Sequence, residues 1–384
     1  MKNRYRHVSA AFGALSVAVI AVAMAATPVT AHRDNDKKPE PLVIEKQGSF
    51  FVNGKTITTN YAGTAGTPGR IVVNQMYVEY WVPQKKREGA YPVVMLHGSN
   101  HTGKTYGETP DGREGWMTDF LRAGYTVYVA EQVGRARSSF NPTKVNQAKA
   151  TQDASILPTL SSSSYEGAWD VFRFGPQPDV WHDKIKFPKR DVDQYMAQLV
   201  PNTETTLDFS YETGNALAAL LDKIGPAVVM GHSQGGRYVM TAQTLRPKLM
   251  KGVILVEAAC VLQTTSDPTE IGIKLGKATL LNVYGDYVSL HPFWVGLDRD
   301  CEAIVNQVNQ NGGDATHLRL PTIGITGNDH MMMMDSNSKQ IAGVMMDWID
   351  RHASKKSGHH DDDKGGGHGR GDHGHGDGHG GGRH

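Results

Sequence analysis

Apolar and polar positions alternate in the first part of the folded chain, and the pattern then changes. Residues 42–44, 49–52 and 76–82 show the period of two that is typical of strands with one solvated face. From residue 92 onward, short apolar runs alternate with segments whose apolar residues recur every three or four positions. Buried strands that alternate with helices predict a mostly parallel sheet with helices on both faces. The pattern therefore predicts an α/β fold in which antiparallel strands lead into a twisted parallel sheet.

The later elements can be assigned to residue ranges. The predicted strands are 92–96, 125–130, 226–230, 252–256, 278–284 and 322–326. The predicted helices are 115–121, 211–224, 236–245, 301–311 and 338–349. The last helix has its apolar residues at i, i+3, i+4, i+7 and i+8, on one face: Ile341, Val344, Met345, Trp348 and Ile349.

Residues 133–202 interrupt this rhythm. The segment holds a run of four serines, several prolines and scattered aromatic residues, and it is too long for a simple connection. We therefore predict a cap or insertion with some helix of its own. Its aromatic side chains either line a substrate pocket or pack the cap against the body; these are Trp169, Phe172, Phe174, Trp181 and Phe187.

The first 31 residues have the three parts of a secretory signal peptide. A basic start precedes an apolar run over 8–26, and small residues ending at Ala31 offer a cleavage site. The alternative is an uncleaved anchor, because the run is long enough to span a membrane. The cleavage site and the Ala-rich run favour cleavage. We expect a secreted or periplasmic protein with no membrane contact after cleavage.

The other end, 354–384, is almost free of apolar residues and rich in His, Gly and Asp. Such a segment cannot bury enough apolar surface to fold, and we predict a disordered tail. Its histidines suit transition metals, so the tail either has a metal-binding role or is a solubilising segment whose metal affinity is incidental. A cloning artefact is the third interpretation, against which the irregular spacing of the histidines argues. The ligand spacing is not that of a structural zinc site. We therefore expect no metal in the folded domain, which we assign to 42–353.

Composition and charge exclude some classes of protein. Hydrophobic residues make up 39% of the chain and glycine contributes 43 of its 384 residues, which excludes a fully disordered chain and a multi-span membrane protein. The formal net charge is +1, without the basic excess of a nucleic-acid-binding protein. The two cysteines, Cys260 and Cys301, permit a disulfide in an exported chain, and the alternative is two separate buried thiols.

The sequence Gly231-His232-Ser233-Gln234-Gly235 has the form G-x-S-x-G. An apolar strand is predicted before it and a helix after it, the context in which a sharp turn exposes a nucleophilic serine. The hydroxyl of Ser233 then needs a histidine base. His330 follows the predicted strand 322–326, whereas His291 and His317 do not follow a strand end that reaches the site. This pattern predicts Ser233 as nucleophile and His330 as base.

Two carboxylates compete for the third catalytic role. Asp286 follows the predicted strand 278–284, and Glu257 ends the strand before it. Strand position alone slightly favours Asp286. An oxyanion hole would use the backbone N–H of Gln234, after the nucleophile, and that of Ser99, after the strand ending in His97-Gly98.

The chain also carries several longer motifs: 96–98 (LHG), 109–116 (TPDGREGW), 134–138 (GRARS), 169–175 (WDVFRFG), 232–234 (HSQ), 256–257 (VE) and 327–333 (GNDHMMM). With these motifs the sequence resembles a small group of secreted bacterial esterases in the α/β-hydrolase superfamily. The resemblance implies an α/β-hydrolase fold with a cap insertion and a Ser–Glu–His triad, which selects Glu257 above Asp286. It also implies a bridge between Cys260 and Cys301. Ser99-Asn100 stand where the best-known member has adjacent cysteines, and the His-rich tail is not part of the family pattern.

These features together predict a secreted serine hydrolase that cleaves carboxylic esters through an acyl-enzyme and needs no cofactor. Its expected partner is a small-molecule ester; no nucleic acid is expected. A lactonase, thioesterase or peptidase could use the same triad. A different class of protein is a non-catalytic one that keeps the fold and sequesters metal with its tail. Such a protein should have lost a member of the triad, and none is missing from the sequence.

Overall fold

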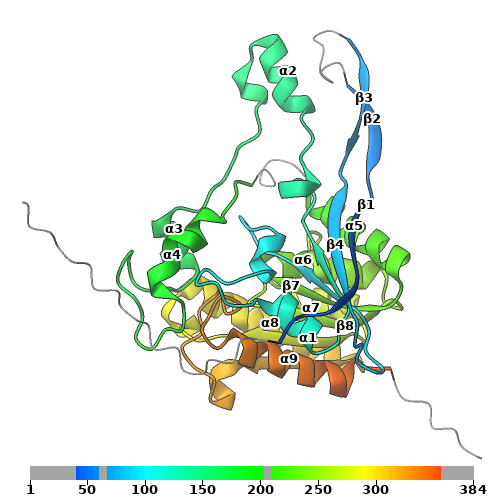
Figure 1. Ribbon diagram of the computed structural model, residues 1–384. Helices are drawn as coiled ribbons and strands as arrows, with labels where there is room; N and C mark the ends of the chain where they lie inside the picture. The colour runs from blue at the N-terminus through cyan, green and yellow to red at the C-terminus, as the bar shows by residue number, and fades with distance from the viewer. Residues whose placement is uncertain (1–39, 60–66, 203–208, 356–384) are drawn as a thin grey trace, which may run out of the picture. The chain divides into compact units, whose positions relative to one another are not determined.

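A mixed sheet of eight strands carries the fold, in the order β1-β4-β6-β5-β7-β8-β9-β10 (Figure 1). The first three in this order pair antiparallel: β1 (Ile44–Val52), β4 (Met76–Pro83) and β6 (Val127–Ala130). The others pair parallel, from β6 through β5 (Val93–Leu96), β7 (Ala227–His232), β8 (Met250–Val256) and β9 (Thr279–Tyr284) to β10 (Asp314–Arg319). This arrangement agrees with the fold class predicted from the hydrophobic pattern.

The buried strands divide the core into two layers, because successive side chains of a strand point to opposite faces. In β8, Val253 and Leu255 belong to one apolar cluster, and Ile254 and Val256 belong to the other. Residues of α5 (Phe209–Ile224), α6 (Gln234–Leu245), α7 (Pro268–Leu275) and α8 (Pro292–Gln310) join the first cluster. Residues of α1 (Trp116–Arg122) and α9 (Ser338–His352) join the second, and these two helices lie side by side in Figure 1. Helices therefore cover both faces.

The prediction of a last strand at 322–326 is wrong. The last strand is β10, which lies at the edge of the sheet. Its side chains stay partly exposed, so its sequence mixes polar and apolar residues and lacks the apolar pattern of a buried strand. Leu320–Ile323 instead forms a 3₁₀ turn, η6. Pro321 fixes its own φ and cannot donate to a ladder, and Gly324 ends the turn at φ 79°. The segment that leads to His330 is therefore a loop, not a strand.

Other elements differ in extent from the predictions. β1 is one strand where two were expected, and α8 begins nine residues before the predicted helix 301–311. The pattern also missed α7 and a two-stranded hairpin, β2 (Lys55–Thr59) with β3 (Gly69–Val73). The remaining 3₁₀ turns are η1 (Gly103–Tyr106), η2 (Ala136–Ser138), η3 (Ala154–Ile156), η4 (Lys189–Asp191) and η5 (Val288–Leu290).

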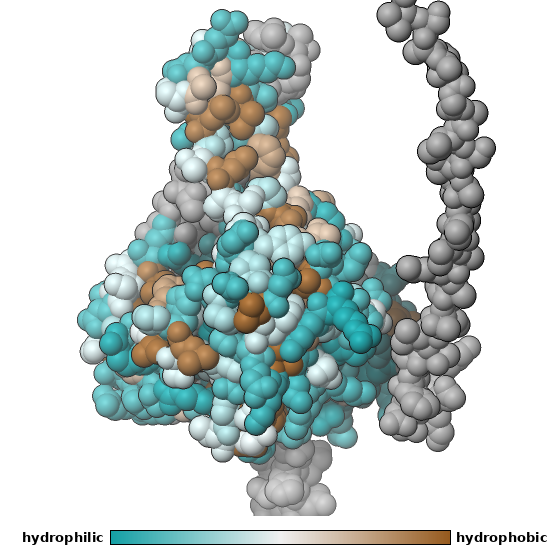
Figure 2. All heavy atoms as spheres, turned by 90° about the vertical axis from the view of Figure 1, so that its left-hand side faces the viewer, coloured by the Kyte–Doolittle hydropathy of each residue, from teal (hydrophilic) through white to brown (hydrophobic). Residues whose placement is uncertain are grey.

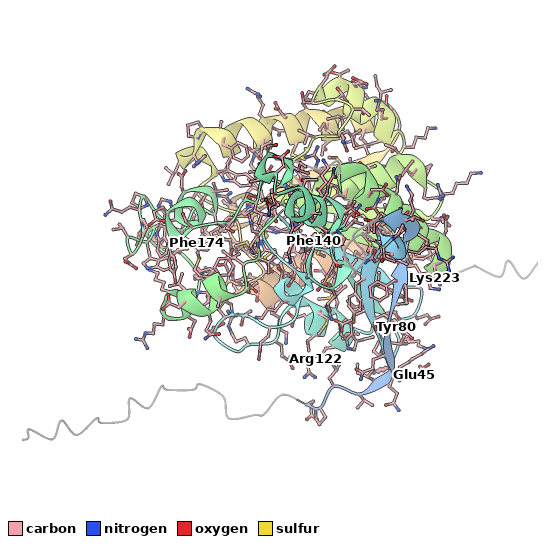
Figure 3. All side chains as sticks on the ribbon, turned by 90° about the horizontal axis from the view of Figure 1, so that it is seen from above. Glu45, Tyr80, Arg122, Phe140, Phe174 and Lys223 are labelled. Carbon is pink, nitrogen blue, oxygen red and sulfur yellow. A yellow bond between two sulfur atoms is a disulfide. The ribbon has the colours of Figure 1, made fainter. Side chains whose placement is uncertain are left out.

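The insertion holds α2 (Thr143–Thr151), α3 (Tyr165–Val171) and α4 (Val192–Ala197). Its aromatic residues pack mainly on one another. Phe174, labelled in Figure 3, is fully buried, and its ring centroid lies 4.4 Å from that of Phe187 and 5.6 Å from those of Trp169, Trp181 and Tyr195. These rings belong to the second apolar cluster, so they pack the insertion against the body of the fold. Around α2 the apolar side chains are exposed instead (Figure 2), with Phe140, Leu157 and Leu160 the largest of them.

Cys260 and Cys301 form a disulfide, as expected. Cys260 follows β8 and Cys301 lies in α8, and both are buried. The bridge therefore ties the segment after Glu257 to the longest helix of the first layer.

The structure is a computed structural model that describes residues 40–59, 67–202 and 209–355. The predicted signal peptide lies outside these ranges, as does all but the beginning of the predicted tail. Ser354 and Lys355 are described and belong to the folded part, because the Lys355 N–H donates to the Gly89 carbonyl (2.9 Å) and the Ser354 hydroxyl to the Asp350 carbonyl (2.9 Å). Within the described ranges, no helix is both long and apolar enough to cross a membrane.

Candidate active site

Ser233 lies on a sharp turn between β7 and α6, with φ 51° and ψ −123°. This backbone conformation is unfavourable for a residue with a side chain, and such strain is concentrated at functional sites. Neighbouring strands hold the turn in place: the Ser233 N–H donates to Val256 O (2.9 Å), and Ser233 O accepts from the Ala259 N–H (3.2 Å). The serine is only partly buried, whereas His232 before it is fully buried. The turn thus exposes the side chain of Ser233 while hydrogen bonds hold its backbone in place.

The two glycines of the motif are needed for space. A Cβ at Gly231 would lie 2.8 Å from the backbone of Gly235, and a Cβ at Gly235 would lie 2.6 Å from His97 O. Both contacts are with backbone, which cannot move away. The motif therefore fits the sequence requirement of a strand–turn–helix elbow packed against the loop after β5.

Glu257 immediately follows β8, also in a left-handed conformation (φ 49°), and it is fully buried. Its Oε2 lies 3.5 Å from Nδ1 of His330, and its Oε1 accepts from the Gly285 N–H (2.6 Å). Asp286 has a different environment, because its carboxylate accepts from the N–H groups of Tyr287 (2.9 Å) and Gly327 (3.1 Å). The geometry favours Glu257 as the partner of His330, against the preference from strand position.

His330 lies on the loop between η6 and α9 and is 1% exposed. Its backbone N–H donates to Phe172 O (3.1 Å), and its ring stacks on the Phe172 ring, with centroids 5.4 Å apart. Nε2 of His232 is 2.9 Å from His330 O, which brings the loop next to Ser233. Burial and the guanidinium of Arg173 hold the pKa of His330 well below its usual value. The imidazole is therefore neutral at neutral pH, as a general base must be.

The two other histidines that were considered lie elsewhere. His317 is part of β10, and its Nε2 is 2.8 Å from Asp298 Oδ1. His291 precedes α8, and its Nε2 is 3.2 Å from Asp170 Oδ1. The described structure thus groups Ser233, His330 and Glu257 at the carboxyl ends of the parallel strands, where open α/β sheets place their sites.

Arg173 lies within the motif 169–175 of the insertion and is not among the site residues predicted from the sequence. Its two terminal nitrogens bind both oxygens of Glu257 (2.9 and 2.7 Å), and its Nε donates to Asp286 O (3.0 Å). The pair is buried, with Arg173 2% exposed, and the guanidinium lies over the ring of Trp294 at 4.9 Å. The bidentate geometry fixes the carboxylate plane. The insertion therefore contributes a side chain that orients Glu257.

Replacing Arg173 with methionine is expected to lower kcat/KM by about 10²-fold, because the acid loses its support and the base shifts out of position. The acid limb of the pH–rate profile should also move to higher pH, since loss of the neighbouring cation raises the pKa of His330. Arg173→Lys keeps the charge without the two-point contact and should give an intermediate shift. The measurement is kcat/KM against pH for the three proteins. An unmoved acid limb in folded Arg173→Met would contradict this role.

Buried carboxyl groups flank the base. Asp329 and Asp335 are both fully buried, and burial raises the pKa of Asp329 far above its ordinary value and that of Asp335 to about 7. Asp329 Oδ1 accepts from the Met331 N–H (2.6 Å), and Asp335 Oδ2 accepts from Asn328 Nδ2 (2.6 Å). The negative charge of Asp335 raises the pKa of Asp329 further, so the pair retains a proton at neutral pH. These carboxyls shape the loop that carries His330.

The loop after β5 carries Ser99 and is fixed by two asparagine side chains. Asn100 (φ 57°) donates its N–H to Asn202 Oδ1 (3.0 Å) and its Nδ2 to the carbonyls of Ser161 (3.2 Å) and Val200 (3.0 Å). Asn202 Nδ2 donates to Ser99 Oγ (2.7 Å). Ser161 and Asn202 also exchange both backbone hydrogen bonds (3.0 and 2.8 Å). Two segments of the insertion, around Ser161 and around Asn202, therefore hold the loop after β5 in place.

The loop also places the backbone N–H of Ser99 where it could donate to an anion. A Cβ at Gly98 would lie 2.9 Å from the Cβ of Ser233, so this backbone packs directly on the candidate nucleophile. Among the described residues, the Ser99 N–H has no protein acceptor. Gln234, which carries the second N–H, is the first residue of α6 and directly follows Ser233. Both predicted donors therefore lie beside Ser233.

Comparison with known proteins identifies the family. A probable secreted lipase, phiG, of Fungal sp. (strain ATCC 74256) is 30% identical over 329 residues, which span 72% of this chain and 86% of the lipase. A bacterial esterase of known structure is 34% identical and has a TM-score of 0.78; the match covers 84% of this chain and all of that one. No model of a known protein family matches the chain. The predicted α/β-hydrolase fold is thereby confirmed, and the chain belongs to the esterase and lipase family of the α/β-hydrolase superfamily.

Proposed function

We propose that the protein is a serine esterase that cleaves carboxylic esters through a covalent acyl-enzyme. The observation that carries the proposal is the grouping of a strained serine turn with a buried Glu257–His330 pair, whose Oε2–Nδ1 distance is 3.5 Å. A serine hydroxyl becomes an effective nucleophile when a neutral imidazole can take its proton and a carboxylate holds that imidazole. The similarity to a lipase and an esterase supports the same chemistry.

The reaction would proceed in two halves. Ser233 Oγ attacks the ester carbonyl while its proton passes to Nε2 of His330, and Glu257 stabilises the resulting imidazolium. The N–H groups of Ser99 and Gln234 stabilise the negative oxygen of the tetrahedral intermediate. His330 then gives the proton to the leaving alcohol, and the C–O bond breaks. Water attacks the acyl-enzyme by the same steps in reverse roles, releasing the acid and free Ser233.

We also propose that the enzyme acts outside the cell. The relative phiG is described as a probable secreted lipase, and the first 31 residues have the composition of a signal peptide. Intact mass measurement of the protein recovered from outside the cytoplasm tests this. A mature chain that begins after Ala31 is expected, and a retained Met1 would contradict cleavage.

Substrate class is tested with chromogenic carboxylic esters that share one leaving group and with substrates of other classes. Carboxylic esters of increasing acyl length are compared with the corresponding thioester, amide and phosphate, and with an unsubstituted lactone. The proposal predicts the highest kcat/KM for an ester and a rapid initial release of about one leaving group per enzyme with a slowly deacylating ester. Preference for the lactone or thioester would assign the triad to those substrates. Absence of turnover with every member would contradict an enzymatic role.

A further inference from the structure

Arg135 is a buried cation beside the candidate oxyanion hole that the proposed reaction does not yet use. It lies in the loop between β6 and η2, within the motif 134–138, and only 3% of its surface is exposed. Its Nη1 donates to Gly98 O (2.7 Å) and its Nη2 donates to Gln234 Oε1 (2.7 Å). The Arg135 guanidinium therefore contacts both the loop after β5 and the first residue of α6, the two segments that lie next to Ser233.

The contact at Gly98 acts on the first oxyanion donor directly, because Gly98 C=O and Ser99 N–H belong to the same peptide group. The described chain has no cis peptide bond, so this N–H points away from its own carbonyl oxygen. A cation that holds the oxygen therefore fixes the direction of the N–H. It also polarises the peptide, since hydrogen bonds strengthen one another along a chain in a low-dielectric interior.

Two neutral side chains also contact the carbonyl oxygen of Gly98. Gln132 Nε2 lies 3.4 Å from Gly98 O, and Nδ1 of His97 lies 2.9 Å from it. Burial and the positive charge of Arg135 hold the pKa of His97 well below its usual value, so the ring is neutral. The charge at this peptide therefore comes from Arg135, whose pKa burial lowers only to about 10.

The contact at Gln234 acts on the second donor through the side chain of the same residue. Gln234 begins α6 directly after the strained Ser233, where a small backbone rotation would redirect its N–H. Binding of its amide oxygen by Arg135 restrains the residue relative to the loop after β5. The relative position of the two donors thus depends on the Arg135 side chain, which binds Gly98 O and Gln234 Oε1.

We propose that Arg135 is a positioning residue that aligns and polarises the two oxyanion donors, and that it stabilises the tetrahedral intermediate without touching the substrate. The inference rests on the proposed esterase function. An interaction of this kind is made stronger in the transition state than in the bound substrate, so its removal should lower kcat and leave KM nearly unchanged.

The test compares Arg135→Met and Arg135→Lys with a matched control, Arg137→Met. Arg137 is in the same motif, but its guanidinium binds Glu131 and Glu79 away from the two donors. We measure kcat and KM for the best ester. We also measure the inhibition constant of a trifluoromethyl ketone, which adds to the nucleophile as a tetrahedral oxyanion, and that of the matching methyl ketone, which reports ground-state binding.

Arg135→Met is expected to lower kcat by about 10- to 100-fold, less than the loss from removing a donor itself, with KM changed less than about threefold. Trifluoromethyl ketone affinity should fall by the same factor, while methyl ketone affinity stays. Arg135→Lys should recover part of both losses, and Arg137→Met should show neither. Unchanged kcat and trifluoromethyl ketone affinity in folded Arg135→Met would overturn the proposal, as would an equal loss in Arg137→Met.

A variant that fails to fold does not end the test. Gln234→Met keeps the backbone donor and removes only the side-chain contact, and it should show a smaller loss of the same kind. The absence of any loss in Gln234→Met and Arg135→Lys would also overturn the role. If the wild type does not bind the trifluoromethyl ketone more tightly than the methyl ketone, the proposed function itself fails. If it does and Arg135→Met matches it, only this inference fails.

Discussion

Ser233→Ala is expected to lower kcat/KM for ester hydrolysis by at least about 10⁴-fold, because no other group can form the acyl-enzyme. The substitution removes one oxygen and keeps the Cβ, so it adds no steric conflict to the turn at φ 51°. The hydrogen bonds that hold the turn involve the backbone of Ser233 and survive the change. Thermal unfolding should therefore stay close to that of the wild type while activity is lost.

The matched control is Ser289→Ala, which removes the hydroxyl of an exposed serine in η5. It should keep both activity and stability. Turnover of the ester by Ser233→Ala within about tenfold of the wild type would refute the nucleophile. A comparable loss in Ser289→Ala would point to damage of the fold rather than loss of a catalytic group.

Glu257→Gln is expected to lower kcat by about 10³- to 10⁴-fold, because a neutral amide neither holds the reactive tautomer of His330 nor stabilises its cation. Asp286→Asn should change kcat by less than about tenfold. The Asp286 carboxylate accepts from two backbone N–H groups, and an amide can keep one of these contacts. Steady-state kinetics of the two variants, measured side by side, decides between the carboxylates.

Folding must be monitored in this comparison, because Glu257→Gln leaves the buried Arg173 guanidinium without a carboxylate. Breaking a buried pair from one side costs about 3–5 kcal/mol. Glu257→Asp keeps the charge and shortens the reach, so it provides a second variant whose activity loss reflects geometry. If only Asp286→Asn loses several orders of magnitude in kcat, the acid is Asp286 and the triad proposed here is wrong.

The sequence was most informative where one local segment carries the chemistry. The strand, the turn and the helix around Ser233 are contiguous, and their hydrophobic pattern predicted β7 and α6 to within a few residues. His330 was selected from its place after the last strand. That strand was misplaced, since β10 is a mixed polar strand at the sheet edge. His330 still lies near the carboxyl ends of the parallel strands, because the loop between η6 and α9 that carries it returns there.

The sequence was least informative where a side chain acts through distant partners. Arg173 and Glu257 are separated by 84 residues, Asn100 and Asn202 by 102, and Arg135 and Gly98 by 37. No periodicity or spacing relates such pairs, since the fold alone brings them together. The choice between Glu257 and Asp286 was difficult for the same reason. Both follow adjacent strands, so strand position did not separate them; the resemblance to secreted esterases favoured Glu257, and the contact of Glu257 with His330 forms only in the folded chain.

The central claim is that Ser233 forms a covalent intermediate, and the most direct measurement is peptide mass spectrometry after treatment with a fluorophosphonate. Such a probe reacts with the activated serine of this enzyme class and leaves a stable phosphonyl adduct. We predict one adduct per chain, located on Ser233, with loss of ester hydrolysis in proportion to labelling and no adduct in Ser233→Ala. Full ester turnover by a chain that carries the adduct, or labelling of a different residue in parallel with inactivation, would contradict the account.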